Sequence, residues 1–93
     1  MNIQEHVNCM KNGMIGYRYK HFKGATYIVT DLAVNSETEE IMVVYKNFLD
    51  PSQVWVRPLD MFISKVDSEK YPDVKQEFRF KRIDNEKNFG LKE

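Results

Sequence analysis

Hydrophobic side chains recur every three or four positions over the start of the chain, at Ile3, Val7, Met10 and Met14. This spacing places them along one face of a helix. Such a helix would end near Gly13 or Gly16, because glycine commonly terminates helices. We treat residues 1–14 as a leader that forms a short helix or remains disordered.

From residue 17 the pattern changes to alternation, which is typical of a strand with one buried face. A first strand would place three ring side chains on the same face, namely Tyr17, Tyr19 and His21. Residues 26–34 are rich in β-branched and aromatic types and predict a second strand. The polar residues 35–40 then predict the loop of a hairpin whose other strand is residues 41–48.

Shorter elements are predicted after this hairpin. Residues 54–57 form a short strand that Pro58 should end, because proline has no backbone N–H to donate to the ladder. Residues 59–62 are long enough for one 3₁₀ turn, and residues 63–66 predict a fifth strand.

The last part of the chain adds one more alternating run, with Phe78, Phe80 and Ile83, which predicts an additional C-terminal strand. The polar residues 84–93 predict a mobile tail. Five short strands closing on themselves would make a small barrel, so we expect a mainly β fold, a five-stranded barrel domain at residues 15–83.

Composition limits the classes of protein. The chain has 93 residues, 42% of them hydrophobic and 13% aromatic, which suffices for one core but not two. Lys plus Arg and Asp plus Glu both count 14, giving a net charge of zero. Proteins that depend on phosphate contacts usually carry a basic excess, so the global charge argues against nucleic acid as a partner.

The cysteine count and hydropathy indicate a compartment. Cys9 is the single cysteine and cannot form a disulfide within the chain, so we expect a reducing, cytoplasmic setting. No apolar run has the length of a signal peptide core or the roughly 20 residues of a membrane span. We expect no membrane partner and no cofactor, and the sequence leaves the oligomeric state open.

Two short segments, His-Phe-Lys-Gly at residues 21–24 and Trp-Val-Arg-Pro at residues 55–58, form a specific pattern. Matching residues lie around them, at Tyr19, Tyr27, Val29, Ala33, Ser36, Glu37, Thr38, Glu40, Val43, Val44, Tyr45, Met61 and Phe62. This combination resembles the small bacterial family called domain of unknown function 1653, over roughly residues 16–66. The resemblance implies an SH3-like β barrel and no particular activity.

The chain departs from the family pattern at one position. Family members often have a basic residue or histidine just before the Ser-Glu-Thr segment, where this chain has Asn35. A site formed by two histidines is therefore not implied here.

Trp55 and Arg57 lie two positions apart on a predicted strand and so point to the same face, where a guanidinium can lie against an indole. They form the floor of a recognition groove if Trp55 is partly exposed. The alternative is that Trp55 is the largest core residue and Arg57 covers it. The sequence leaves both interpretations open.

The stretch around the first strand is the most basic one, since Arg18, Lys20 and Lys23 alternate with Tyr19 and His21. Aromatic rings interleaved with cations suit stacking on bases and contact with phosphates. The plainer interpretation is a solvated strand whose lysines discourage pairing at a sheet edge.

Other candidate sites have less support. His6 and Cys9 have a His-x-x-Cys spacing, but structural zinc normally needs four ligands. The acidic stretch from Asp31 to Glu40 lacks the spacing of a calcium loop, so we expect no metal site. A hydrolase would need His21 to approach Ser36 in space.

We therefore expect a non-enzymatic binding module that holds a protein segment or peptide through an aromatic surface. The expected ligand-binding residues are Tyr19, His21, Lys23, Trp55 and Arg57. The alternative is weak nucleic-acid binding through the basic strand around Arg18 to Lys23, and an enzyme is the third possibility.

Overall fold

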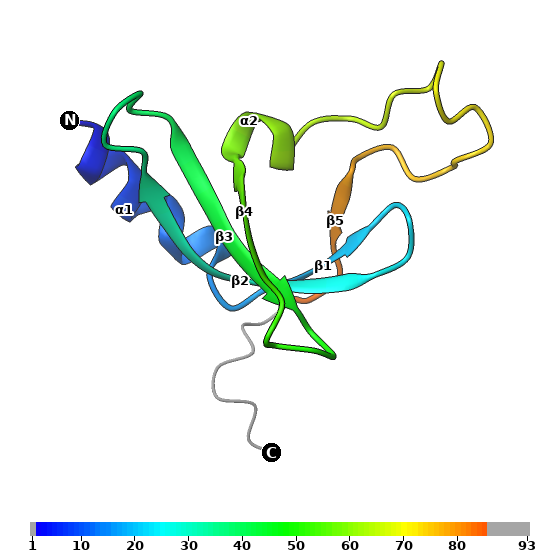
Figure 1. Ribbon diagram of the computed structural model, residues 1–93, viewed down its shortest axis with the longest axis horizontal. Helices are drawn as coiled ribbons and strands as arrows, with labels where there is room; N and C mark the ends of the chain where they lie inside the picture. Colours follow the sequence, from blue (N-terminus) through cyan, green and yellow to red (C-terminus); the bar gives the residue numbers. More distant parts are fainter. Residues whose placement is uncertain (1, 86–93) are drawn as a thin grey trace.

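A computed structural model, which describes residues 2–85, shows one five-stranded antiparallel sheet with two helices. Figure 1 shows α1 at one end of the long β2–β3 hairpin and α2 above the sheet. The strand order is β4-β3-β2-β1-β5. In chain order the elements are α1 (Ile3–Met14), β1 (Arg18–His21), β2 (Thr26–Val34), β3 (Ile41–Asn47), β4 (Val54–Pro58), α2 (Leu59–Phe62) and β5 (Phe80–Arg82).

The sheet is strongly curled. In a flat sheet, three strand spacings of about 4.8 Å would hold β3 and β5 about 14 Å apart. Here the ring centroids of Tyr45 on β3 and Phe80 on β5 are 5.4 Å apart. The mainly β fold with five antiparallel strands is confirmed, but β4 and β5 are the two ends of the strand order and do not pair, so this sheet is not closed.

Helix α2 lies between the two ends of the sheet. It follows β4 directly, and its Phe62 stacks on Phe80 of β5 with ring centroids 4.1 Å apart and planes 8° apart. A helical turn, rather than a further strand, therefore joins the two edges through their side chains. The turn is α-helical, because the Ile63 N–H donates to the Leu59 carbonyl, and not the expected 3₁₀ turn.

The predicted strand at residues 63–66 is wrong. The Ser64 N–H and hydroxyl both donate to the Met61 carbonyl, so the backbone leaving α2 is still engaged in the helical turn. Ile63 is 54% exposed, and only an isolated bridge between Lys65 and Phe78 follows. The fifth strand is instead β5, which lies within the additional strand predicted around Phe80 and pairs antiparallel with β1.

Residues 3–14 adopt the helical alternative. Asn2 caps α1, because its side chain accepts from the Glu5 N–H while the Glu5 carboxylate accepts from the Asn2 N–H. Val7 is fully buried in the same core as the sheet residues. The predicted leader is thus part of the domain core. Neither helix in the described part of the chain has the length and apolarity needed to cross a bilayer.

An ion pair holds the end of β5 to the start of β1. The Arg18 guanidinium donates from Nε and Nη2 to the Asp84 carboxylate at 2.8–3.0 Å, and the Arg18 N–H donates to it at 2.8 Å. The Asp84 side chain is only 8% exposed, so the predicted mobile tail does not begin at residue 84. Residues 86–93 lie outside the described part of the chain.

Candidate functional site

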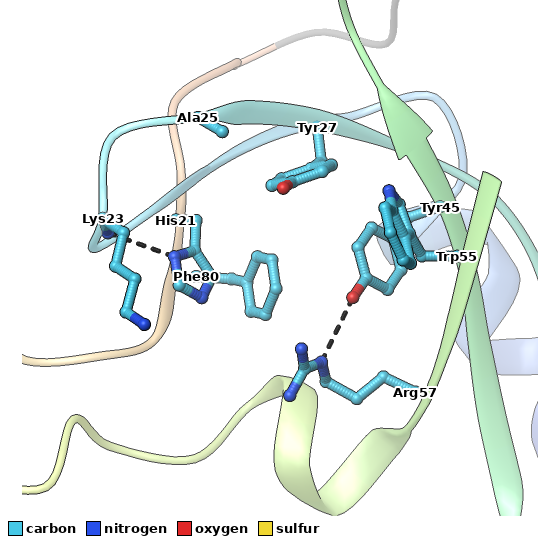
Figure 2. A pocket seen from close by; sticks show the side chains of 8 residues that line it. All are labelled: His21, Lys23, Ala25, Tyr27, Tyr45, Trp55, Arg57 and Phe80. Atoms are coloured by element: carbon cyan, nitrogen blue, oxygen red, sulfur yellow. Dashed lines mark hydrogen bonds between the residues drawn. The ribbon is translucent and has the colours of Figure 1, made fainter. Parts of the chain in front are cut away.

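A groove of about 320 Å³ lies at the end of the sheet where the β1–β2 turn faces β4 (Figure 2). Ring and cationic side chains line most of it. The lining residues are His21, Lys23, Ala25, Tyr27, Tyr45, Trp55, Arg57 and Phe80. The groove therefore joins the two segments on which the family resemblance rests, residues 21–24 and 55–58, although about thirty residues separate them in the chain.

Strand β4 positions Trp55 and Arg57. Its register places Trp55 opposite Tyr45 and Arg57 opposite Val43, so both side chains point to the inner face of the curled sheet. Trp55 is 49% exposed because β4 is an end strand and nothing in residues 2–85 covers it. Of the two interpretations of this tryptophan, the exposed one is correct.

The sequence suggested that the Arg57 guanidinium lies against the Trp55 indole. The structure places it elsewhere. Its Nε donates to the Tyr45 hydroxyl at 3.1 Å, and its Cζ is 5.7 Å from the centre of the Phe80 ring. Figure 2 shows the guanidinium projecting across the groove toward His21 and Phe80. Tyr45 therefore fixes one side of the guanidinium and leaves the two terminal nitrogens available.

His21 forms the opposite wall. It ends β1, and the chain then turns through Gly24, whose φ of +115° is a conformation that favours glycine. The Lys23 N–H donates to His21 Nδ1 at 3.1 Å, so the neutral ring carries its proton on Nε2. Burial lowers the pKa of His21, and the charges of Arg57, Lys23 and Arg79 lower it further.

Aromatic rings form the floor of the groove. Tyr27 and Tyr45 pack edge to face at 5.2 Å, and Phe80 lies 4.9 Å from the His21 ring. Tyr27, Tyr45 and Phe80 were not among the predicted site residues. The signal for the tyrosines was present, since a hairpin pairing of residues 26–34 with 41–48 brings alternate aromatic positions to one face.

Tyr19 is the one predicted site residue that the structure places elsewhere. It is 9% exposed and packs edge to face on Phe62 at 5.2 Å, inside the core. Burial raises the pKa of its phenol. The other four predicted residues, His21, Lys23, Trp55 and Arg57, all line the groove.

The basic residues in and just after β1 lie in different surroundings. Arg18 is paired with Asp84 and its Cζ lies 4.9 Å from the Phe48 ring centre. Lys20 is exposed beside Lys81 of β5 and does not line the groove. Only Lys23 reaches the groove, so these cations do not form one continuous surface.

The residues of the other candidate sites, the hydrolase site and the metal sites, do not come together in the structure. Tyr27, near His21, is the second residue of β2, whereas Ser36 follows the end of that strand at Val34; seven residue steps of about 3.3 Å separate Tyr27 from Val34 by about 23 Å. Asn35, at the family's variable position, accepts from the Glu37 and Thr38 N–H groups and so shapes the loop. Among residues 2–85 no three His, Cys, Asp or Glu side chains could hold a metal ion together.

Comparison with known proteins gives a family. No curated protein and no solved structure gives a significant match to the chain. The profile of the family described as Protein of unknown function (DUF1653) matches residues 17–82, well over half of the chain. This span begins just before β1 and ends with β5, so it contains the whole sheet and the groove. The chain belongs to the DUF1653 family.

Proposed function

We propose that this domain is a non-enzymatic binding module that holds an extended segment of another protein in the groove between β1 and β4. The observation behind the proposal is the meeting of His21 and Lys23 with Trp55 and Arg57 around one open groove. These side chains come from the two segments that define the family resemblance. An exposed indole beside a positioned guanidinium is the composition typical of protein-binding surfaces.

The neighbouring edge strand favours an extended partner. Strand β4 is an end of the sheet, and its outward residues Val54 and Val56 are 58% and 60% exposed. An edge strand offers unpaired backbone groups to which a peptide can add as a further strand, while its side chains enter adjacent pockets. A peptide running along β4 would place alternate side chains over Trp55 and Arg57.

We also propose that the curled sheet is an SH3-like barrel, in which α2 fills the gap between the two edge strands. The stacking of Phe62 on Phe80 across that gap supports this proposal. The groove would then lie at the open end of the barrel.

Nucleic acid has weaker support as the partner. The groove is lined by two permanently charged side chains, Lys23 and Arg57, whereas protein surfaces that bind nucleic acid usually make several phosphate contacts along a basic path. Arg18, which would have extended that path, is neutralised by Asp84.

Selection of displayed random peptides on the immobilised domain tests the proposal. We expect the enriched peptides to bind the wild type and a Val56→Ala variant, and to lose at least about tenfold in affinity for Trp55→Ala. Val56 is the matched control, because it lies on the same strand and is similarly exposed, but on the opposite face.

Acrylamide quenching of the single tryptophan supplies the second measurement. A bound peptide should shield Trp55, so quenching should decrease when peptide is added. Peptides that bind Trp55→Ala as well as the wild type, without changing the quenching, would contradict the groove as the binding site.

A further inference from the structure

The polar groups around the groove are mostly hydrogen-bond donors. Arg57 and Lys23 have only N–H donors, and His21 presents its Nε2 proton because Nδ1 is occupied by the Lys23 N–H. Among residues 2–85, no Asp or Glu side chain lines the groove. A ligand that satisfies this set must supply acceptors.

The Arg57 guanidinium is positioned to bind a planar anion. Its Nε is used by the Tyr45 hydroxyl, and that bond fixes the plane of the guanidinium. The two terminal nitrogens then form the fork that binds a carboxylate through two parallel hydrogen bonds. In Figure 2 this end of Arg57 is directed into the groove, toward the ring of His21.

The cations around His21 form no ion pair with a carboxylate in the described part of the chain. The three ion pairs among residues 2–85 join Lys11 to Asp31, Arg18 to Asp84 and Lys65 to Glu77, so they include none of the cations around His21. Arg79, another cation near His21, has a buried Nε with no hydrogen-bond partner in the described part of the chain. Lys23 and Arg57 thus bring positive charge to the groove that no carboxylate within residues 2–85 pairs with.

We propose, building on the binding function above, that the groove selects an acidic peptide segment, with a Glu or Asp carboxylate held by the Arg57 fork and the His21 Nε2 proton. The residues flanking that carboxylate are hydrophobic, because Trp55 and Tyr27 line the same groove with ring surfaces. A peptide is favoured over a polynucleotide because one fixed fork matches a single carboxylate, and β4 offers its edge to an extended backbone.

Two degenerate, end-blocked heptapeptide pools test this proposal. Both have Val flanking the central position, which is Glu in one pool and Gln in the other. We expect the wild type to prefer the Glu pool by about tenfold or more, the effect of one charge-assisted hydrogen bond. Arg57→Gln should abolish the preference, and Arg57→Lys should weaken it, because lysine keeps the charge without the fork.

Lys46→Gln is the matched control, since it removes one charge from β3 at a position opposite Val54, outside the groove. It should keep the full preference. Denaturant unfolding of each variant confirms that it is folded. An independent measurement is the NMR titration of His21, whose pKa should rise when the Glu pool binds and not when the Gln pool binds.

The outcomes separate this inference from the proposed function. Equal binding of both pools, lost in Trp55→Ala, overturns the acidic selectivity and leaves the peptide-binding function. Binding of neither pool overturns both. Preferential binding of a single-stranded oligonucleotide, with displacement of the Glu pool, assigns the groove to nucleic acid and also overturns the proposal.

Discussion

The two ends of the β2–β3 hairpin differ in how they are covered, although the same two strands form both ends. At one end Leu32 and Val43, paired in the ladder, are almost fully buried together with Val7 of α1. At the other end Tyr27 and Tyr45 face the open groove beside Trp55. The difference comes from what covers the sheet, since α1 packs on β2 and α2 on β3 and β4.

This comparison shows that an inward-facing ring is a core residue only where a helix covers it. Phe62 is 1% exposed and Trp55 is 49% exposed, yet both lie on the inner side of the curl. Phe62 contributes mainly to stability. Trp55 leaves about half of its surface exposed.

The largest expected effect sharpens this contrast between the two rings. Phe62→Ala should lower the free energy of unfolding by about 3–5 kcal/mol, because it removes a buried ring in contact with Tyr19, Tyr45 and Phe80. Trp55→Ala should cost less than about 1 kcal/mol, since much of the indole is already in water. Urea denaturation measures both, and similar losses for the two variants would contradict the division between core and groove.

A smaller effect tests whether α1 is an integral cover of the buried end. Asn2→Ala removes the N-cap acceptor of the Glu5 N–H and should lower the free energy of unfolding of the whole domain by about 1 kcal/mol. Asn12→Ala, at an exposed position of the same helix, is the control and should not destabilise the domain, because alanine is the better helix former. If α1 melted separately, before the sheet, the Asn2 variant would leave the main transition unchanged.

The smallest effect concerns the open end and its pH dependence. Burial and the nearby cations hold the pKa of His21 below 6.5, so the unfolded chain binds this proton more readily than the folded one. Stability should therefore be constant above about pH 6.5 and fall as the pH drops toward the folded pKa. Comparing unfolding at pH 7.5 and 5.5 in wild type and His21→Gln isolates this loss, and an equal pH dependence in both proteins would refute it.

Sequence patterns predicted the elements whose neighbours are close in the chain. The hairpin of β2 and β3, the strand at β4 and its end at Pro58 all follow from alternation and turn chemistry. Residues 63–66 looked like a strand because their composition suits one, but the helical turn before them uses the N–H groups of Ile63 and Ser64, and only the isolated bridge between Lys65 and Phe78 remains.

The site was predictable in part for the same reason. Alternation placed Trp55 with Arg57, and the segment with His21 and Lys23 was recognised as aromatic and basic. Alternation could not show that Tyr19 is buried under α2 while His21 remains partly exposed. This difference depends on Phe62, which lies far along the chain. The partner of Arg18 was missed because Asp84 is separated from it by 66 positions.

The position of β5 late in the sequence determines when the groove forms during folding. Phe80 belongs to the last strand of the sheet, yet it contacts rings from β1, β2, β3 and α2. During synthesis the segments with His21 and Trp55 emerge well before it, and contacts of such long sequence separation form late in folding. Until Phe80 docks, the groove lacks the part of its floor that this ring forms, and Arg57 lacks its contact with it. Ligand binding would thus report that the chain has been translated through β5 and that this strand has joined the sheet.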